Sequence, residues 1–159
     1  MSKLDNFIKA LDDKTITDFT TYLENSPTSF REVMAERGIE VDALVAKGEP
    51  SVIEVLISNG YATEHYEKWK THPDSRVRGE LARQGYWPDF FIQDKKPDVR
   101  CSVAVAYHEY IPQILNRTES EWCGALHLIE HNLDMPIEIL KLFLETREQL
   151  RRKTNPTQI

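Results

Sequence analysis

Apolar side chains recur along this chain in short segments that share one pattern. Within each segment an apolar anchor is followed four positions later by a second apolar residue, which places both side chains on one face of a helix. The anchors are Phe30, Val52, Val77, Val99 and Trp122, and the second residues are Met34, Leu56, Leu81, Val103 and Leu126. Successive anchors are separated by 22, 25, 22 and 23 residues. A spacing this regular indicates an internal repeat.

Glycine and proline residues mark where the helices are expected to end and begin. A glycine stands eight positions after each of the first three anchors, and glycine ends a helix because it adopts the left-handed conformation at low cost. These glycines are Gly38, Gly60 and Gly85. A second apolar cluster follows each segment, and a proline, which suits the first turn of a helix, introduces the last three clusters. These prolines are Pro88, Pro112 and Pro136.

The repeat predicts an all-α fold. A helical unit this small cannot bury its apolar face alone, so neighbouring units must stack. We expect a short right-handed α-solenoid of about five repeats, each an α-helix followed by a short α or 3₁₀ helix. A single domain should cover residues 1–151, with a cap at 1–26, repeats at 27–135 and a C-terminal helix at 136–151. Residues 152–159 are expected to form a flexible tail.

The stretch HPDSRVRGELARQGYWPDFFIQDKKPDVRCSVAVAYHEYIPQILNRTES carries a family resemblance. It resembles the leucine-rich repeat variant family, whose repeats of about 24 residues look like D-x-x-V-R-x-x-V-A followed by P-x-x-L-x-x-L. The resemblance covers residues 73–143 and fades toward the N-terminus, where Phe30-Arg31 and Val52-Ile53 replace Val-Arg. It implies a HEAT-like solenoid in which α-helices alternate with shorter, often 3₁₀, helices.

The resemblance implies no cofactor for this chain. Some members of the family carry an iron–sulfur cluster on a cysteine-rich N-terminal extension. The first cysteine of this chain is Cys101, so that property is not carried over.

Composition and charge narrow the class of function. The chain has 20 Lys and Arg against 26 Asp and Glu, a net charge of −6. A nucleic-acid-binding surface needs a surplus of basic residues, and residues 1–80 have 10 basic against 15 acidic ones. No apolar stretch is long enough to span a bilayer, so we expect no membrane association and a cytoplasmic location.

The sequence favours a non-enzymatic module that binds another protein or a peptide. Stacked repeats create an extended surface, and the chain lacks a phosphate loop, an HExxH zinc motif and a nucleophile elbow. Tryptophan and tyrosine dominate interface hot spots. The candidate contacts are Tyr86, Trp87, Tyr107 and Glu109. In the same aromatic run we expect Tyr86 and one or both of Phe90 and Phe91 to contribute to the core.

One alternative is a HEAT-like protein that binds nucleic acid or another anion. The stripe would consist of Arg76, Arg78, Arg83 and Arg100. Arg78 and Arg100 directly follow anchor valines, and in repeats of this type such arginines pair with an acidic residue of the turn between repeats. The expected acidic partners are Asp74, Asp98 and Glu121.

A second alternative is a metal site at Cys123, His127 and His131. These residues recur every four positions, along one side of a helix, and thiolate and imidazole are ligands that zinc prefers. His127 occupies a row of the repeat alignment that is otherwise apolar, which favours a packing role. We therefore predict no metal and no cofactor, with this helix as the place where a metal would bind.

The repeat register makes a prediction about stability. Leu81→Ala should open a cavity between repeats and lower the free energy of unfolding by about 2–4 kcal/mol. Arg152→Ala, in the charged C-terminal segment, should leave it nearly unchanged. Thermal unfolding of both variants checks the prediction, and an unchanged melting temperature for Leu81→Ala would show that the register is wrong.

Overall fold

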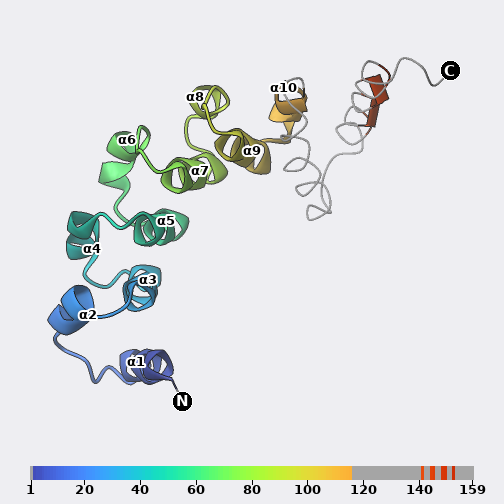
Figure 1. Ribbon diagram of the computed structural model, residues 1–159. Helices are drawn as coiled ribbons and strands as arrows, with labels where there is room; N and C mark the ends of the chain where they lie inside the picture. The colour runs from blue at the N-terminus through green and yellow to red at the C-terminus, as the bar shows by residue number, and fades with distance from the viewer. Residues whose placement is uncertain (1, 116–140, 142–143, 146–147, 150–151, 153–159) are drawn as a thin grey trace. The chain divides into compact units, whose positions relative to one another are not determined.

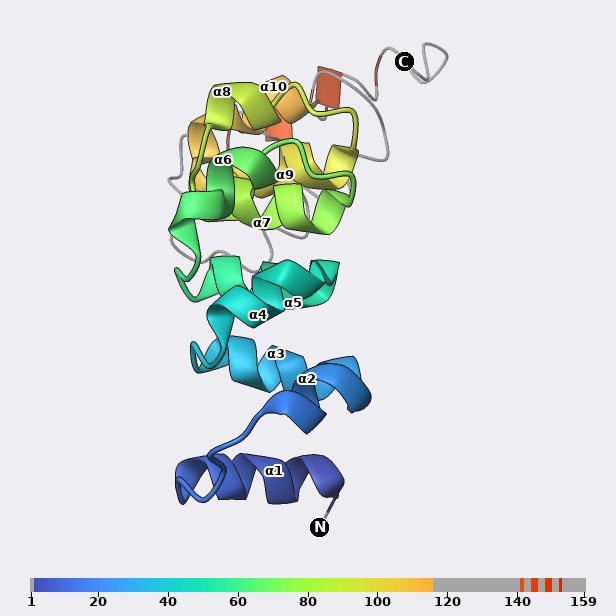
Figure 2. The same ribbon diagram turned by 90° about the vertical axis from the view of Figure 1, so that its left-hand side faces the viewer.

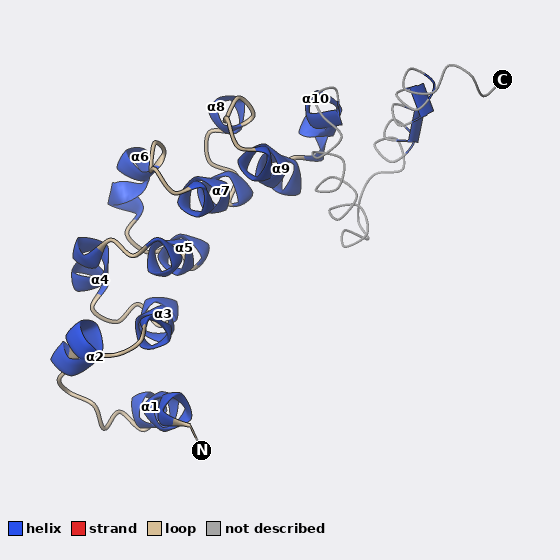
Figure 3. Cartoon of the chain, in the orientation of Figure 1, coloured by secondary structure: helices blue, strands red, loops and turns tan. Residues whose placement is uncertain are grey.

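The regular secondary structure in the part of the chain that the structure describes is helical. This structure is a computed structural model that describes residues 2–115, 141, 144–145, 148–149 and 152. The helices are α1 (Lys3–Asp12), α2 (Thr20–Asn25), α3 (Thr28–Glu36), α4 (Val41–Lys47), α5 (Pro50–Ser58), η1 (Thr63–His65), α6 (Tyr66–Trp69), α7 (Ser75–Arg83), α8 (Pro88–Phe91), α9 (Pro97–Ala106), η2 (His108–Tyr110) and α10 (Ile111–Leu115). No strand occurs among these residues (Figure 3), which confirms the all-α prediction for them. The segment anchored on Trp122 lies outside the described residues, and so does most of 136–159.

The chain divides into two compact units, residues 1–77 and 78–159, with the boundary inside α7. In the first unit the longer helices α1, α3 and α5 form one row, and α2, α4 and α6 form a second row beside it (Figures 1 and 2). In the second unit α8 and α10 both pack on α9. Each unit therefore places short helices against longer ones. The single domain over residues 1–151 stays a prediction.

The longer helices bury the positions that the repeat alignment selects. The anchors of α3, α5, α7 and α9 are at most 8% exposed, and the residues four positions later are completely buried. These later residues are Met34, Leu56, Leu81 and Val103. The predicted burial of both rows is confirmed in these four helices. The apolar row of each helix therefore forms its packing face.

The first three of these helices end in the same backbone turn. Gly60 has a φ of +75°, and the amide of Tyr61 donates a hydrogen bond of 2.9 Å to the carbonyl of Leu56. This bond, five residues back along the chain, is the mark of a Schellman turn. Gly38 and Gly85 also have positive φ and are followed by the same hydrogen bond. The predicted glycine stops are confirmed.

A second left-handed residue follows each glycine two positions later, and here it is not glycine. These residues are Glu40, Ala62 and Trp87, with φ of 54°, 58° and 45°. Each is the residue from which the next short helix begins. The turn between a long and a short helix therefore has one backbone conformation, whatever side chain the sequence supplies.

Two of the turn glycines leave room for a tyrosine ring from a later segment. A Cβ atom on Gly38 would lie 2.7 Å from Cζ of Tyr61, and one on Gly85 would lie 3.1 Å from the hydroxyl oxygen of Tyr107. Both distances are shorter than ordinary contacts. Glycine is therefore needed at Gly38 both for its conformation and for space.

Comparison of two glycines separates these requirements. Gly48 has a φ of +68°, close to the +65° of Gly38, but a Cβ atom there would meet nothing within 4 Å. Gly48→Ala should therefore lower the free energy of unfolding by only about 1 kcal/mol, which is the cost of the left-handed backbone. Gly38→Ala should lower the free energy of unfolding by about 1–3 kcal/mol more than Gly48→Ala does, because the Tyr61 ring must move. Urea unfolding measures the stability of both variants. Equal losses of stability would contradict the close approach of the Tyr61 ring to Gly38.

Candidate interaction surface

Aromatic side chains gather at the surface of the second unit, around α8 and η2. Tyr86, Phe90 and Tyr107 are 39%, 45% and 36% exposed, and the only other large apolar side chain this exposed among the described residues is Leu144. Trp87 is half-buried and its ring lies 5.6 Å from that of Tyr86. With Tyr110 these residues make up what we call the aromatic surface.

The short helix α8 directs its two phenylalanines differently. Consecutive residues of a helix point about 100° apart, so one of them can enter the core while the other faces outward. Phe91 is completely buried, whereas Phe90 is 45% exposed. The buried ring supports its neighbours, since the ring centres of Phe90 and Trp87 lie 5.3 and 6.3 Å from that of Phe91.

Two hydrogen bonds join the aromatic residues of the η2 region to α8 and the turn before it. The hydroxyl of Tyr107 donates to the carbonyl of Gly85 at 3.2 Å, and that of Tyr110 donates to a carboxylate oxygen of Asp89 at 2.6 Å. The hydrogen bond to Asp89 raises the pKa of Tyr110, so the phenol keeps its proton to a higher pH than a free tyrosine does. Segments about one repeat apart in sequence thus form one surface.

The structure brings the predicted contact residues together. Tyr86 and Trp87 are in ring contact, Tyr107 is bonded to the residue before Tyr86, and Glu109 is exposed within η2. The expectation that Tyr86 belongs to the core is wrong, because Tyr86 is 39% exposed. Its amide closes the turn after α7, which leaves its ring where the chain exits the helix.

Sequence reasoning does not select Phe90 or Tyr110 as contact residues. It places Phe90 in the core as readily as Phe91, because an apolar pair does not reveal which member faces outward. Tyr110 follows Asp89 by about one repeat length. That spacing is the one sequence feature that could have predicted the contact between Tyr110 and Asp89, because equivalent parts of adjacent helical repeats are expected to lie side by side.

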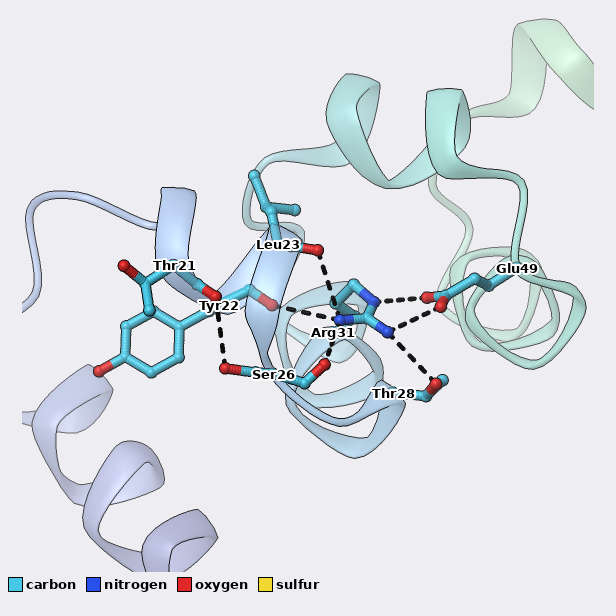
Figure 4. A network of polar contacts seen from close by, with 7 residues as sticks. All are labelled: Thr21, Tyr22, Leu23, Ser26, Thr28, Arg31 and Glu49. Carbon is cyan, nitrogen blue, oxygen red and sulfur yellow. Dashed lines mark hydrogen bonds and ion pairs between the residues drawn. The ribbon is translucent and has the colours of Figure 1, made fainter.

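The arginine that follows the anchor is buried in three helices. Arg31, Arg78 and Arg100 are 6%, 5% and 8% exposed. The Nε and Nη2 atoms of Arg31 donate to the two carboxylate oxygens of Glu49 at 2.5 and 2.7 Å (Figure 4). Its Nη1 donates to the carbonyl of Ser26 at 2.6 Å. A guanidinium is tolerated in the interior only when its charge and its donors are satisfied in this way.

Arg78 forms the corresponding fork in the second unit. Its Nε and Nη2 donate to the carboxylate of Asp94 at 2.7 and 3.1 Å, and Arg100 donates to the backbone carbonyl of the same residue at 2.6 Å. Burial alone would raise the pKa of Asp94. Hydrogen bonds from Arg78 and from the Lys96 amide outweigh that effect and lower it.

The kind of partner for Arg78 is predicted correctly, but its identity is wrong. Its carboxylate belongs to Asp94, in the turn that follows α8, and neither to Asp74 nor to Asp98. Asp74 pairs with Arg76 at 2.8 Å, and hydrogen bonds from the side chain and the amide of Arg76 lower its pKa to about 2. The other residue expected as a partner, Glu121, lies outside the described residues.

Arg76, Arg78 and Arg83 of the expected anion stripe form ion pairs with described residues. Arg76 and Arg78 have the carboxylate partners given above, and Arg83 lies 3.4 Å from Glu80. Arg100 is buried and donates to a backbone carbonyl. These contacts support a structural role for the arginines.

The proposed metal ligands Cys123, His127 and His131 lie outside the described residues. Within the described part of the chain, no three His, Cys, Asp or Glu side chains lie together as a metal site would require. None of the helices described here has the length and apolar character needed to cross a membrane.

Comparison with known proteins gives no match: no family model, curated protein or solved structure corresponds to this chain. The likeness of residues 73–143 to the leucine-rich repeat variant pattern therefore stays a resemblance in sequence.

Removing the carboxylate of Asp94 tests the buried fork. Asp94→Asn should lower the free energy of unfolding at neutral pH by about 3 kcal/mol, because the Arg78 charge stays buried without its partner. Since the folded pKa of Asp94 lies below the ordinary 3.8, the stabilisation is complete above about pH 4 and is lost as the pH falls through the folded value. The difference in the free energy of unfolding between wild type and Asp94→Asn should therefore become smaller below pH 4.

Asp12→Asn is the matched control for this experiment. Asp12 pairs with Arg37 at 3.0 Å, but the two side chains are 61% and 34% exposed. Loss of this ion pair in Asp12→Asn should lower the free energy of unfolding by less than about 1 kcal/mol. Denaturant unfolding between pH 2.5 and 7 measures the stability of both variants. If the stability lost by Asp94→Asn does not change with pH, the stabilising role of the Asp94 carboxylate is contradicted.

Proposed function

We propose that this protein is a non-enzymatic interaction module, which binds a segment of another protein on the aromatic surface. The observation that carries the proposal is the clustering of three exposed rings, Tyr86, Phe90 and Tyr107, around the half-buried Trp87. Grouped exposed aromatic side chains are typical of sites where proteins associate. Hydrogen bonds from Tyr107 and Tyr110 hold the surface in shape before a partner arrives, which reduces the entropy cost of binding.

The backbone at Trp87 is a second argument for a role outside folding. A bulky residue with a φ of +45° is disfavoured by about 1–2 kcal/mol. The turn itself accepts other residues, because Glu40 and Ala62 have the same conformation at the equivalent position. The turn therefore does not require tryptophan, which supports a role for the half-buried indole in binding as well as in packing against Phe91.

The proposal includes the finer architecture. We infer a right-handed α-solenoid of about five repeats, similar to the leucine-rich repeat variant and HEAT families, in a cytoplasmic protein. Equivalent buried rows in α3, α5, α7 and α9 and the shared turn after the first three support it. Anion binding is not favoured, since the arginines that would serve it are engaged within the chain.

Photo-crosslinking at the aromatic surface tests the proposed function. A benzophenone amino acid placed at Phe90 should give a discrete protein adduct in cells that express the chain. The same group at Leu144, which is 51% exposed, is the control for non-specific contacts. Mass spectrometry identifies the adducts. The proposal is contradicted if Phe90 gives no adduct, or if both positions give the same set.

A further inference from the structure

The two segments that carry the aromatic surface have acidic residues as their fixed charges. Residues 84–93 and 107–113 contain Asp89 and Glu109 but neither lysine nor arginine. Both carboxylates are exposed. The preceding residue, Arg83, already lies 3.4 Å from the carboxylate of Glu80. Within these two segments the fixed charges beside the exposed rings are thus negative, and the next basic residues, Lys95 and Lys96, come only after Asp94.

From this pattern we infer that the partner segment is basic, and that an arginine or lysine side chain packs on Trp87 and Tyr86 with Asp89 and Glu109 as countercharges. The inference rests on the proposed function and names the chemistry of the partner. Indole and phenol rings attract cations through their faces, and tryptophan does so most strongly. Arginine fits best, because its planar guanidinium stacks on a ring and also donates to a carboxylate.

The contacts of Asp89 fit this role. Its Oδ1 accepts the hydrogen bond from Tyr110 at 2.6 Å, which fixes the carboxylate beside the rings. Its Oδ2 has no hydrogen-bond partner among the described residues and can accept from a guanidinium. An acidic or phosphorylated segment would instead meet like charges at Asp89 and Glu109, which disfavours association.

Selection from a random peptide library tests the inference and works for a partner of any identity. A phage library of twelve-residue peptides is selected on the full chain and counter-selected on Trp87→Gly. Glycine accepts the left-handed backbone at this position, so the variant should keep its fold while losing the indole. Phe90→Ser serves as a second variant, because Phe90 is 45% exposed. Circular dichroism and thermal unfolding check both.

We expect the selected peptides to be enriched in arginine or lysine. In fluorescence anisotropy, replacing the essential basic residue of a synthetic peptide by glutamine should weaken binding about fivefold or more. Glu109→Gln should also weaken binding and reduce its salt dependence. Glu36→Gln should do neither, because Glu36 is an exposed carboxylate of the other compact unit.

The outcomes distinguish this inference from the proposed function. Peptides that require Trp87 but bind equally well with glutamine in place of every basic residue would overturn the inference and leave the interaction module standing. Failure to select any peptide that requires Trp87 and Phe90 would overturn both. Concentration-dependent dimerisation that Trp87→Gly abolishes would show that a second copy of this chain occupies the surface, and would also overturn the inference.

Discussion

The buried arginine–carboxylate fork is the contact on which the placement of the short helices depends. Arg31 reaches Glu49 and Arg78 reaches Asp94, and each fork closes a loop that contains one short helix, α4 or α8. A buried guanidinium cannot give up its carboxylate without a large cost, so the ends of the loop stay together. Part of the aromatic surface lies on such a loop, because Tyr86, Trp87 and Phe90 fall between Arg78 and Asp94. Its geometry is therefore set by an ion pair that a partner need not contact.

The repeat without this arginine uses apolar packing instead. Ile53 stands where the other three helices have arginine, and its side chain is buried. The following segment is held by Tyr66 and Trp69, which are 3% and 4% exposed, and the hydroxyl of Tyr66 donates to the carbonyl of Ile57. The acidic residue before the next helix, Asp74, is then available to bind Arg76. One architecture thus accepts either an electrostatic or an apolar closure at the same position.

The features of the fold that depend on local periodicity can be predicted from the sequence, whereas those that depend on packing cannot. The buried rows, the glycine turns and the proline start of α8 follow from helical spacing and from the preferences of single residues, so they are predictable. The partner of Arg78 is not, because several carboxylates lie within reach along the chain and only the packing of α8 selects Asp94. Exposure of Phe90 depends likewise on how the four-residue helix α8 is rotated, and exposure of Tyr86 depends on the turn that closes α7. The αL conformation of Trp87 has no signal, since tryptophan disfavours it.

The tyrosines that cover the turn glycines do not occupy the same row of the alignment. Tyr61 comes one residue after a turn glycine, in the row of Tyr86, whereas Tyr107 stands in the glycine row itself. A ring can therefore reach the preceding turn from either of two adjacent positions. A gain or loss of one residue between repeats need not remove this contact. The unequal spacing of the anchors, 22 to 25 residues, is thus compatible with the same ring-over-glycine contact at Gly38 and Gly85.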